Sequence, residues 1–282
     1  MSDKVQVHID DDGNATVLLN RPEVHNALDP EMMDALTVSF RKLDKDPKVR
    51  AVVLMGSGES FCAGADITHM KKSASYTRQQ NYAAAQRSAQ MFYTLYHLRK
   101  PTIACVRGAV RGGGCGVVAA CDIAVASRLA TFRLSEVKIG VIPAMISPYV
   151  IGAIGERMAR RYMLTGEEFD SAEAYRMGLV HDIVEDEELV PRVSTLLFHL
   201  YSSGPAAIAA IKALIPMSAH SIVGPRIINE TARRIAAIRA TPEAQEGMAA
   251  FLEKRKPNWI SAAGASAGKK ARAPRSSARR AR

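Results

Sequence analysis

Three consecutive glycines, Gly112, Gly113 and Gly114, restrict the fold of this 282-residue chain more than any other short segment. They follow an apolar run at 102–106 that is typical of a buried strand, and they precede a small-residue run that ends at Cys121. Glycine lets a backbone approach another group closely because it has no Cβ. A glycine-rich turn that opens a helix also directs N–H groups outward, where they can bind a negative charge. The glycines alone fit a close-packed strand-to-helix turn equally well.

A second loop of small residues favours the chemical interpretation. The run at 56–68, Gly-Ser-Gly-Glu-Ser-Phe-Cys-Ala-Gly-Ala-Asp-Ile-Thr, follows an apolar strand predicted at 51–55. Two loops at strand ends can each contribute one backbone N–H. When two such groups converge on one point, they form an oxyanion hole.

Several motifs together resemble the enoyl-CoA hydratase/isomerase (crotonase) family. They keep the family's order and spacing from about residue 5 to 260. The motifs are Asn20-Arg21-Pro22-Glu23, Asn26-Ala27-Leu28, Phe61-Cys62-Ala63-Gly64-Ala65-Asp66-Ile67, Gly112-Gly113-Gly114 and the stretch from Gly247 to Pro257. The resemblance implies a spiral of ββα turns with a helical C-terminal region that makes trimer contacts.

The pattern of elements agrees with an α/β class. A predicted hairpin at 5–19 opens the chain, strands alternate with helices through about residue 185, and only helical patterns follow. Together with the resemblance, this predicts a ββα spiral core at 1–200 that carries the CoA-binding and catalytic site. A helical C-terminal region is expected at 201–261 and a disordered basic tail at 262–282.

The tail accounts for most of the net charge. Of the 38 basic residues, seven lie at 262–282, where there is no acidic residue, and the other 31 nearly balance the 28 acidic residues. Its Ala/Ser/Gly/Lys/Arg composition lacks apolar periodicity and predicts disorder. A basic tail can hold nucleic acid electrostatically, so nucleic-acid binding is an alternative function of another class. A solvated extension is the other interpretation.

Composition also predicts where the chain works. No apolar run reaches the length of about 18 residues that spans a membrane, and the first residues lack the regions of a signal peptide. The cysteines show no metal-ligand spacing and lie in apolar or glycine-rich surroundings, so we expect buried free thiols and no metal site. A cytoplasmic location fits these features. The four cysteines are Cys62, Cys105, Cys115 and Cys121.

The resemblance assigns catalytic roles to Ala65, Gly113 and Glu136. The thioester carbonyl of acyl-CoA would accept hydrogen bonds from the backbone N–H groups of Ala65 and Gly113. Negative charge collects on that oxygen as an enolate develops, and losing one donor can cost about 3 kcal/mol. Glu136 lies where the family carries a catalytic glutamate, and its apolar neighbours are expected to raise its pKa. A surface glutamate paired with a cation is the alternative.

The chain departs from the best-known hydratases of the family at Gly116, where they carry a second glutamate. Family isomerases use a single glutamate, so double-bond isomerisation is the alternative reaction, and a non-catalytic acyl-CoA binder also remains open. The segment 135–150 resembles 3-methylglutaconyl-CoA-type hydratases, which favours hydration of a branched enoyl-CoA in fatty acid or leucine catabolism. The far carboxylate of such a substrate would need a cation. The candidates are Arg111, Arg133, Lys138 and Arg157.

Coenzyme A is expected to lie along 63–68, with Asp66 holding the loop. Because coenzyme A is part of the substrate, no separate cofactor is expected. The partners that the resemblance implies are the acyl-CoA substrate and further copies of the chain, in a homotrimer or a dimer of trimers. The implied substrate-binding residues are Ala63, Ala65, Asp66, Ile67, Thr68, Gly113, Arg21, Ala27 and Lys254.

Overall fold

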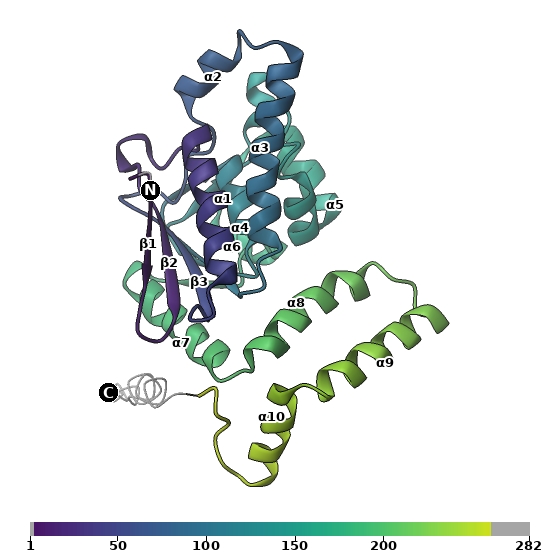
Figure 1. Cartoon of the computed structure of the whole chain (residues 1–282). Coiled ribbons are helices and arrows are strands. Elements are labelled where there is room, and N and C mark those ends of the chain that lie inside the picture. Colours follow the sequence, from purple (N-terminus) through teal and green to yellow (C-terminus); the bar gives the residue numbers. More distant parts are fainter. Residues whose placement is uncertain (1–2, 261–282) are drawn as a thin grey trace, which may run out of the picture. The chain divides into compact units, whose positions relative to one another are not determined.

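The computed structural model describes residues 3–260, and the chain divides into two compact units between Val193 and Ser194. The first unit combines strands and helices, whereas residues 194–260 contain helices only (Figure 1). The predicted α/β class with a helical C-terminal region is confirmed. The tail predicted at 262–282 lies outside the described residues.

Six strands form the main sheet of the first unit. In spatial order they are β1 (Val5–Ile9), β2 (Asn14–Leu19), β3 (Ala51–Gly56), β4 (Thr102–Val106), β6 (Ile123–Ser127) and β9 (Asp182–Val184). β1 and β2 pair antiparallel as the predicted hairpin, and the other neighbours pair parallel. Every residue of β4 is buried, which explains its uninterrupted run of small and apolar residues.

A three-stranded sheet positions the glycine turn. It contains β5 (Ala109–Arg111), β7 (Thr131–Arg133) and β8 (Glu168–Asp170), in that order. β5 and β7 are parallel with Arg111 opposite Arg133, and β7 and β8 are antiparallel. Because parallel strands end at the same edge of a sheet, the segments after β5 and β7 leave that edge side by side. The first carries Gly112 and the second carries Glu136.

Helix α1 (Pro30–Lys45) shows why the predicted helices form. The Asp29 carboxylate caps it by accepting a hydrogen bond from the Met32 N–H at 2.8 Å, and Leu36 and Phe40 on its apolar face are fully buried. Six further helices begin in the first unit. They are α2 (Ile67–Ser73), α3 (Arg78–Tyr96), α4 (Gly113–Ala120), α5 (Ser147–Thr165), α6 (Ser171–Met177) and α7 (Leu189–Tyr201).

The helices of the first unit pack in a continuous series. α3 contacts both α1 and α4, and α4 contacts α5 (Figure 1). α5 leaves the helical conformation at Gly155, where φ is +72°. The short α4 is thus enclosed by α3 and α5. Its first turn contains Gly113 and Gly116.

The second unit contains the end of α7 followed by α8 (Pro205–Ala219), α9 (Pro225–Arg239) and α10 (Pro242–Leu252). Each of the last three helices begins with proline, which has no N–H to leave unpaired there. The Glu243 carboxylate accepts hydrogen bonds from the N–H groups of Ala206 and Ala207, both at 2.9 Å. A negative charge at the N-terminus of α8 stabilises that helix.

Within residues 3–260, no single helix is long and apolar enough to cross a membrane, although one bent helix pair reaches that length and composition when its two members are combined.

The cysteines are free and buried, as the sequence predicts. Burial raises the pKa of Cys62 and Cys115 to about 12 and that of Cys105 to about 11. These thiols are therefore protonated at neutral pH, and we assign no nucleophilic role to them.

Candidate active site

A backbone bridge attaches the loop at 62–66 to the glycine turn. The N–H of Cys62 donates to the Ala109 carbonyl at 3.2 Å, and the N–H of Arg111 donates to the Cys62 carbonyl at 2.9 Å. Ala109 and Arg111 belong to β5, the strand that leads directly into Gly112. The structure therefore brings together the two loops that the sequence singled out.

A second backbone bridge, between Leu28 and Ala65, lies on the other side of this loop, and the Ala65 N–H points away from it. The Leu28 N–H donates to the Gly64 carbonyl at 2.7 Å, and the Leu28 carbonyl accepts from the Asp66 N–H at 3.1 Å. In a parallel bridge of this kind, the residue between the two bonded ones turns its N–H to the opposite side. Ala65 is exposed, and its N–H has no acceptor among residues 3–260. It can therefore donate to a ligand.

Gly113 offers the second donor. It is the first residue of α4, and the first N–H groups of a helix have no partner within the helix. In the part of the chain that the structure describes, the Gly113 N–H finds no other acceptor either. Close contact between the loops requires glycine at the next position, because a Cβ on Gly114 would lie 2.8 Å from the Cys62 carbonyl oxygen.

Glu136 lies against the same turn. It opens the 3-10 turn Glu136–Ile139, and its Oε1 is 2.8 Å from the position that a Cβ on Gly112 would take. Its Oε2 is buried and has no hydrogen-bond partner among the described residues. Burial raises the pKa of this carboxyl above its ordinary value of 4.5. The predicted acid/base and one predicted oxyanion donor are thus neighbours across the glycine turn.

Arg21 and Asp66 form a mostly buried ion pair that stabilises the loop at 62–66. Arg21 Nη2 lies 2.9 Å from Asp66 Oδ2, and Arg21 Nη1 donates to the Ala27 carbonyl at 2.7 Å. Asp66 also caps α2 by accepting from the His69 N–H at 2.9 Å. Burial opposes ionisation of Asp66, but these hydrogen bonds and the Arg21 charge lower its pKa overall. Asp66 therefore holds its loop, whereas contact between Arg21 and substrate stays a prediction.

The remaining predicted CoA-binding residues are distributed over both units. Ala63 is half-buried and Ala27 is buried, whereas Ile67 and Thr68 are exposed at the start of α2. Lys254 is exposed and follows α10 in the second unit. Its contact with coenzyme A also stays a prediction.

Two of the candidate cations for a far carboxylate already bind protein groups. Arg111 donates to the Thr131 carbonyl at 2.8 Å and pairs with Glu168 at 2.5 Å. Arg133 donates through Nε to the Gly166 carbonyl at 2.7 Å. Lys138 and Arg157 are exposed.

Sequence reasoning did not identify the apolar wall beside Gly113. A Cβ on Gly113 would lie 3.1 Å from Leu28 Cδ1 and 3.9 Å from Phe92 Cζ. Both side chains are buried, and Tyr149 continues the wall with its ring centroid 6.1 Å from that of Phe92. Phe92 lies three residues before the buried Leu95 in α3, but helical spacing does not show what a buried side chain faces.

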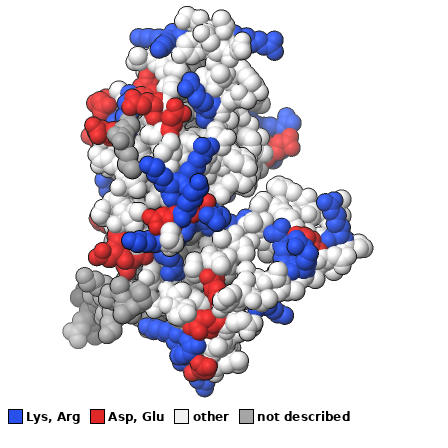
Figure 2. Space-filling model, in the orientation of Figure 1, with Lys and Arg blue, Asp and Glu red and all other residues white. Residues whose placement is uncertain are grey.

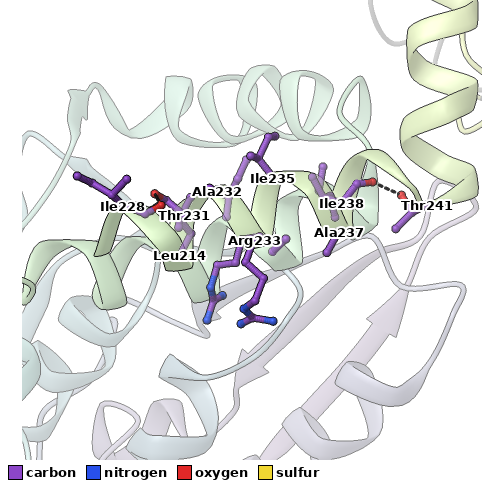
Figure 3. Close-up of a pocket in the computed structure, with 13 residues that line it drawn as sticks. Leu214, Ile228, Thr231, Ala232, Arg233, Ile235, Ala237, Ile238 and Thr241 are labelled. Atoms are coloured by element: carbon purple, nitrogen blue, oxygen red, sulfur yellow. Dashed lines mark hydrogen bonds between the residues drawn. The ribbon is translucent and has the colours of Figure 1, made fainter. Parts of the chain in front are cut away.

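A separate apolar groove of about 910 Å³ lies along α8 and α9 (Figure 3). Ile228, Ile235 and Ile238 line it from α9, and Leu214 lines it from α8. None of the predicted catalytic residues contributes to this groove. The groove is therefore a surface of the second unit, and it is lined by none of the candidate active-site residues.

Comparisons with known proteins give matches over most of the chain. The family model described as enoyl-CoA hydratase/isomerase matches residues 11–262. The (E)-benzylidenesuccinyl-CoA hydratase of Thauera aromatica is 35% identical over 250 or so positions, covering 86% of this chain and 94% of that protein. The crotonyl-CoA hydratase of Syntrophomonas wolfei is 32% identical, covering 88% and 94%. A solved enoyl-CoA hydratase from Shewanella pealeana is 38% identical with a TM-score of 0.88, covering 91% and 96%.

Proposed function

The chain belongs to the enoyl-CoA hydratase/isomerase (crotonase) family, and on this premise we propose that it hydrates an enoyl-CoA thioester with one carboxylate. The backbone N–H groups of Ala65 and Gly113 bind the thioester carbonyl oxygen, and Glu136 transfers the proton. The observation that carries this proposal is the buried Oε2 of Glu136, which has no hydrogen-bond partner among the described residues. The substrate supplies coenzyme A, so no separate cofactor is required.

In the hydration step, Glu136 acts first as a base and then as an acid. The Glu136 carboxylate takes a proton from water as the water oxygen forms a bond to Cβ. The electron pair of the Cα–Cβ double bond moves toward the thioester, and the developing oxyanion is stabilised by the two N–H donors. Glu136, now protonated, delivers that proton to Cα and restores its carboxylate. The raised pKa of Glu136 suits both halves of the step, because a general acid/base works best near the operating pH.

Replacing Glu136 tests this mechanism. Glu136→Gln preserves the shape of the side chain but cannot accept the proton, so we expect kcat for hydration to fall roughly 10²- to 10⁴-fold. Loss of the conjugated enoyl absorbance measures the rate. Glu156→Gln is the matched control, because Glu156 is exposed on α5 and pairs only with the exposed Arg160 among the described residues. Full activity of Glu136→Gln would refute the assignment.

We propose a branched dicarboxylic acyl group such as 3-methylglutaconyl as the substrate. Support comes from the segment 135–150 and from the relative named as a hydratase of benzylidenesuccinyl-CoA, whose acyl group also carries a second carboxylate. The test compares kcat/KM for 3-methylglutaconyl-CoA and crotonyl-CoA. A preference for crotonyl-CoA would contradict the branched substrate while leaving the hydratase mechanism intact.

Double-bond isomerisation is the second candidate reaction, because it needs only one carboxylate to remove a proton from one carbon and return it to another. Gly116 supplies no carboxylate beside Gly113, which favours this alternative. A β,γ-unsaturated acyl-CoA distinguishes the two reactions. Accumulation of the conjugated thioester without a hydroxyacyl product would support isomerisation.

We also propose that the chain works in the cytoplasm as a homotrimer or a dimer of trimers, with Lys254 reaching the coenzyme A phosphates of a neighbouring copy. The apolar groove along α8 and α9 supports assembly, because such a surface is stabilised by a partner. Light scattering would then give three or six times the chain mass.

Nucleic-acid binding is the alternative function of another class. It rests on the basic run at 262–282, which lies outside the described residues. On the face drawn in Figure 2, acidic and basic side chains adjoin one another in several places, and most of the face is uncharged. Salt-sensitive binding that is lost when 262–282 is deleted would support this second function.

A further inference from the structure

Gly116 lies beside the proposed oxyanion donor. It follows Gly113 by three residues in α4, and residues at this spacing share a helix face. Phe92 contacts both positions: a Cβ on Gly113 would lie 3.9 Å from its ring, and a Cβ on Gly116 would lie 3.0 Å from it. A side chain at position 116 would therefore project next to the thioester carbonyl.

Ile146 occupies the space where that side chain would lie. A Cβ on Gly116 would be 2.1 Å from Ile146 Cγ2 and 2.7 Å from Ile146 Cβ. Both distances are shorter than any van der Waals contact between carbons, so even an alanine at 116 would displace Ile146. Ile146 is only 3% exposed, and its carbonyl accepts the N–H of Val150 at 3.0 Å in the first turn of α5.

Given the roles proposed for Gly113 and Glu136, we propose that Ile146 is a specificity-determining residue for the acyl group. Together with Phe92, it fills the volume beside Gly113 with hydrocarbon, where a glutamate side chain at position 116 or a longer apolar acyl chain would otherwise fit. Two tyrosine rings extend this apolar surface. The ring centroid of Tyr149 lies 6.1 Å from that of Phe92 and 5.3 Å from that of Tyr96. Glu136 thus acts beside an apolar surface, and an apolar part of the acyl group packs against Ile146.

Shortening Ile146 tests the selectivity. Ile146→Ala is expected to raise the ratio of kcat/KM for hex-2-enoyl-CoA over crotonyl-CoA about tenfold, because an apolar pocket discriminates between chains that differ by a few methylenes. Ile154→Ala is the matched control. It removes the same atoms from a buried position of α5 that is 6% exposed, and it should leave the ratio unchanged. An unchanged ratio in Ile146→Ala, or an equal rise in the control, would overturn the inference.

A pair of substitutions tests the contact with Gly116. Gly116→Ala alone should lower Tm strongly, whereas Gly116→Ala combined with Ile146→Ala should lower it less than the sum of the single changes. Neighbouring residues that compete for one space show this non-additivity. Strictly additive losses would contradict the contact.

Binding measurements separate this inference from the proposed reaction. Butyryl-CoA and hexanoyl-CoA are saturated and cannot be hydrated, so calorimetry reports the acyl pocket alone. Ile146→Ala should improve the affinity for hexanoyl-CoA relative to butyryl-CoA about tenfold. If the unaltered protein hydrates no enoyl-CoA, the proposed function fails, and this affinity ratio still decides whether Ile146 limits the acyl group.

Discussion

At the scale of single residues, Glu136 is the most informative side chain. Its Oε2 is buried without a hydrogen bond among the described residues, and such an oxygen costs a fold about 1–3 kcal/mol. Its Oε1 faces Gly112, which has a φ of +44° and leaves no space for a Cβ. A purely structural glutamate would gain stability by reaching solvent or a cation, so we infer that this position serves the reaction.

The pH dependence of stability should reveal this burial. Because the folded-state pKa of Glu136 is raised above 4.5, ionising the carboxyl destabilises the fold. Below about pH 4 the carboxyl is protonated in both states and the penalty is absent; as pH rises through the unfolded and then the folded pKa, the penalty develops fully. Glu136→Gln should therefore raise Tm more at pH 8 than at pH 4. The same Tm difference at both pH values would contradict the burial.

Substitutions at two glycines test whether Gly112 positions the Glu136 carboxylate. Gly112→Ala should lower kcat at least tenfold, because its Cβ would lie 2.8 Å from Glu136 Oε1 and displace the carboxylate. Gly140→Ala is the control for a positive φ: at φ +73° and ψ +19° it imposes the left-handed backbone strain of about 1 kcal/mol, and no atom of the described residues lies within 4 Å of its Cβ position. Gly112, at φ +44° and ψ −111°, carries more strain, so Tm of the two variants reports that difference separately from kcat. Steady-state kinetics and Tm of both variants decide the point. Equal kcat values would show that Gly112 does not position Glu136.

At the scale of elements, the loop at 62–66 depends on contacts at both its ends. The bridge between Cys62 and Val110 joins it to β5, and the bridge between Leu28 and Ala65 joins it to the segment before α1. Asp66 then links the loop to α2 as its cap and to Arg21 as its ion partner. The Ala65 N–H is oriented by this whole arrangement rather than by its own side chain.

Replacing Asp66 should therefore weaken both the fold and substrate binding. Asp66→Asn should lower the free energy of unfolding by about 1–3 kcal/mol at pH 7, because Arg21 loses a buried charged partner. The pKa of Asp66 is lowered in the folded state, so its contribution is present above pH 3.8 and is lost as pH falls through the folded pKa. The difference between variant and unaltered protein should shrink at low pH. Denaturant unfolding at pH 7 and at pH 3 measures it.

An exposed ion pair provides the comparison for Asp66. Arg160 and Glu156 lie 2.8 Å apart on α5 with both side chains more than 70% exposed, so Arg160→Met should change stability by less than about 0.5 kcal/mol. A loss in Asp66→Asn no larger than this, or one that is independent of pH, would show that the Arg21 pair does not stabilise the loop.

At the scale of the whole molecule, helices α8 and α9 of the second unit expose several large apolar side chains. No residue of α8 or α9 is classed as buried, and Ile222 and Val223 between them are 93% and 88% exposed. A helical hairpin without a covered face is only marginally stable in water. This surface is the reason to expect that copies of the chain associate.

A charge in the groove should disrupt this assembly. Ile235 is 48% exposed and lines the groove from α9, so Ile235→Asp should reduce the mass measured by light scattering from three or six chains toward one. Arg239→Asp is the control, because it changes an exposed residue of the same helix that does not line the groove. An assembly that survives Ile235→Asp, or a single-chain mass for the unaltered protein, would contradict the proposal.

Much of the element pattern was accessible from the sequence because neighbouring residues determine it. Asp29 caps α1, Pro30 begins it, and the β1–β2 hairpin follows from alternating apolar residues. The family motifs identified the two loops and Glu136. Each of these predictions depends on local sterics, local hydrogen bonds or a short pattern in the chain.

Contacts between distant segments could be obtained only from the tertiary structure. The sequence shows that Arg111 is a cation, but it does not show that Glu168 pairs with it. It also shows that Gly116 has no carboxylate, but it does not show that Ile146 fills the space where a side chain at 116 would lie. Those partners lie 57 and 30 residues away along the chain. The sequence by itself determined which backbone groups and which glutamate could perform the chemistry. The tertiary structure decided what surrounds them, because close packing of the whole core selects each neighbour.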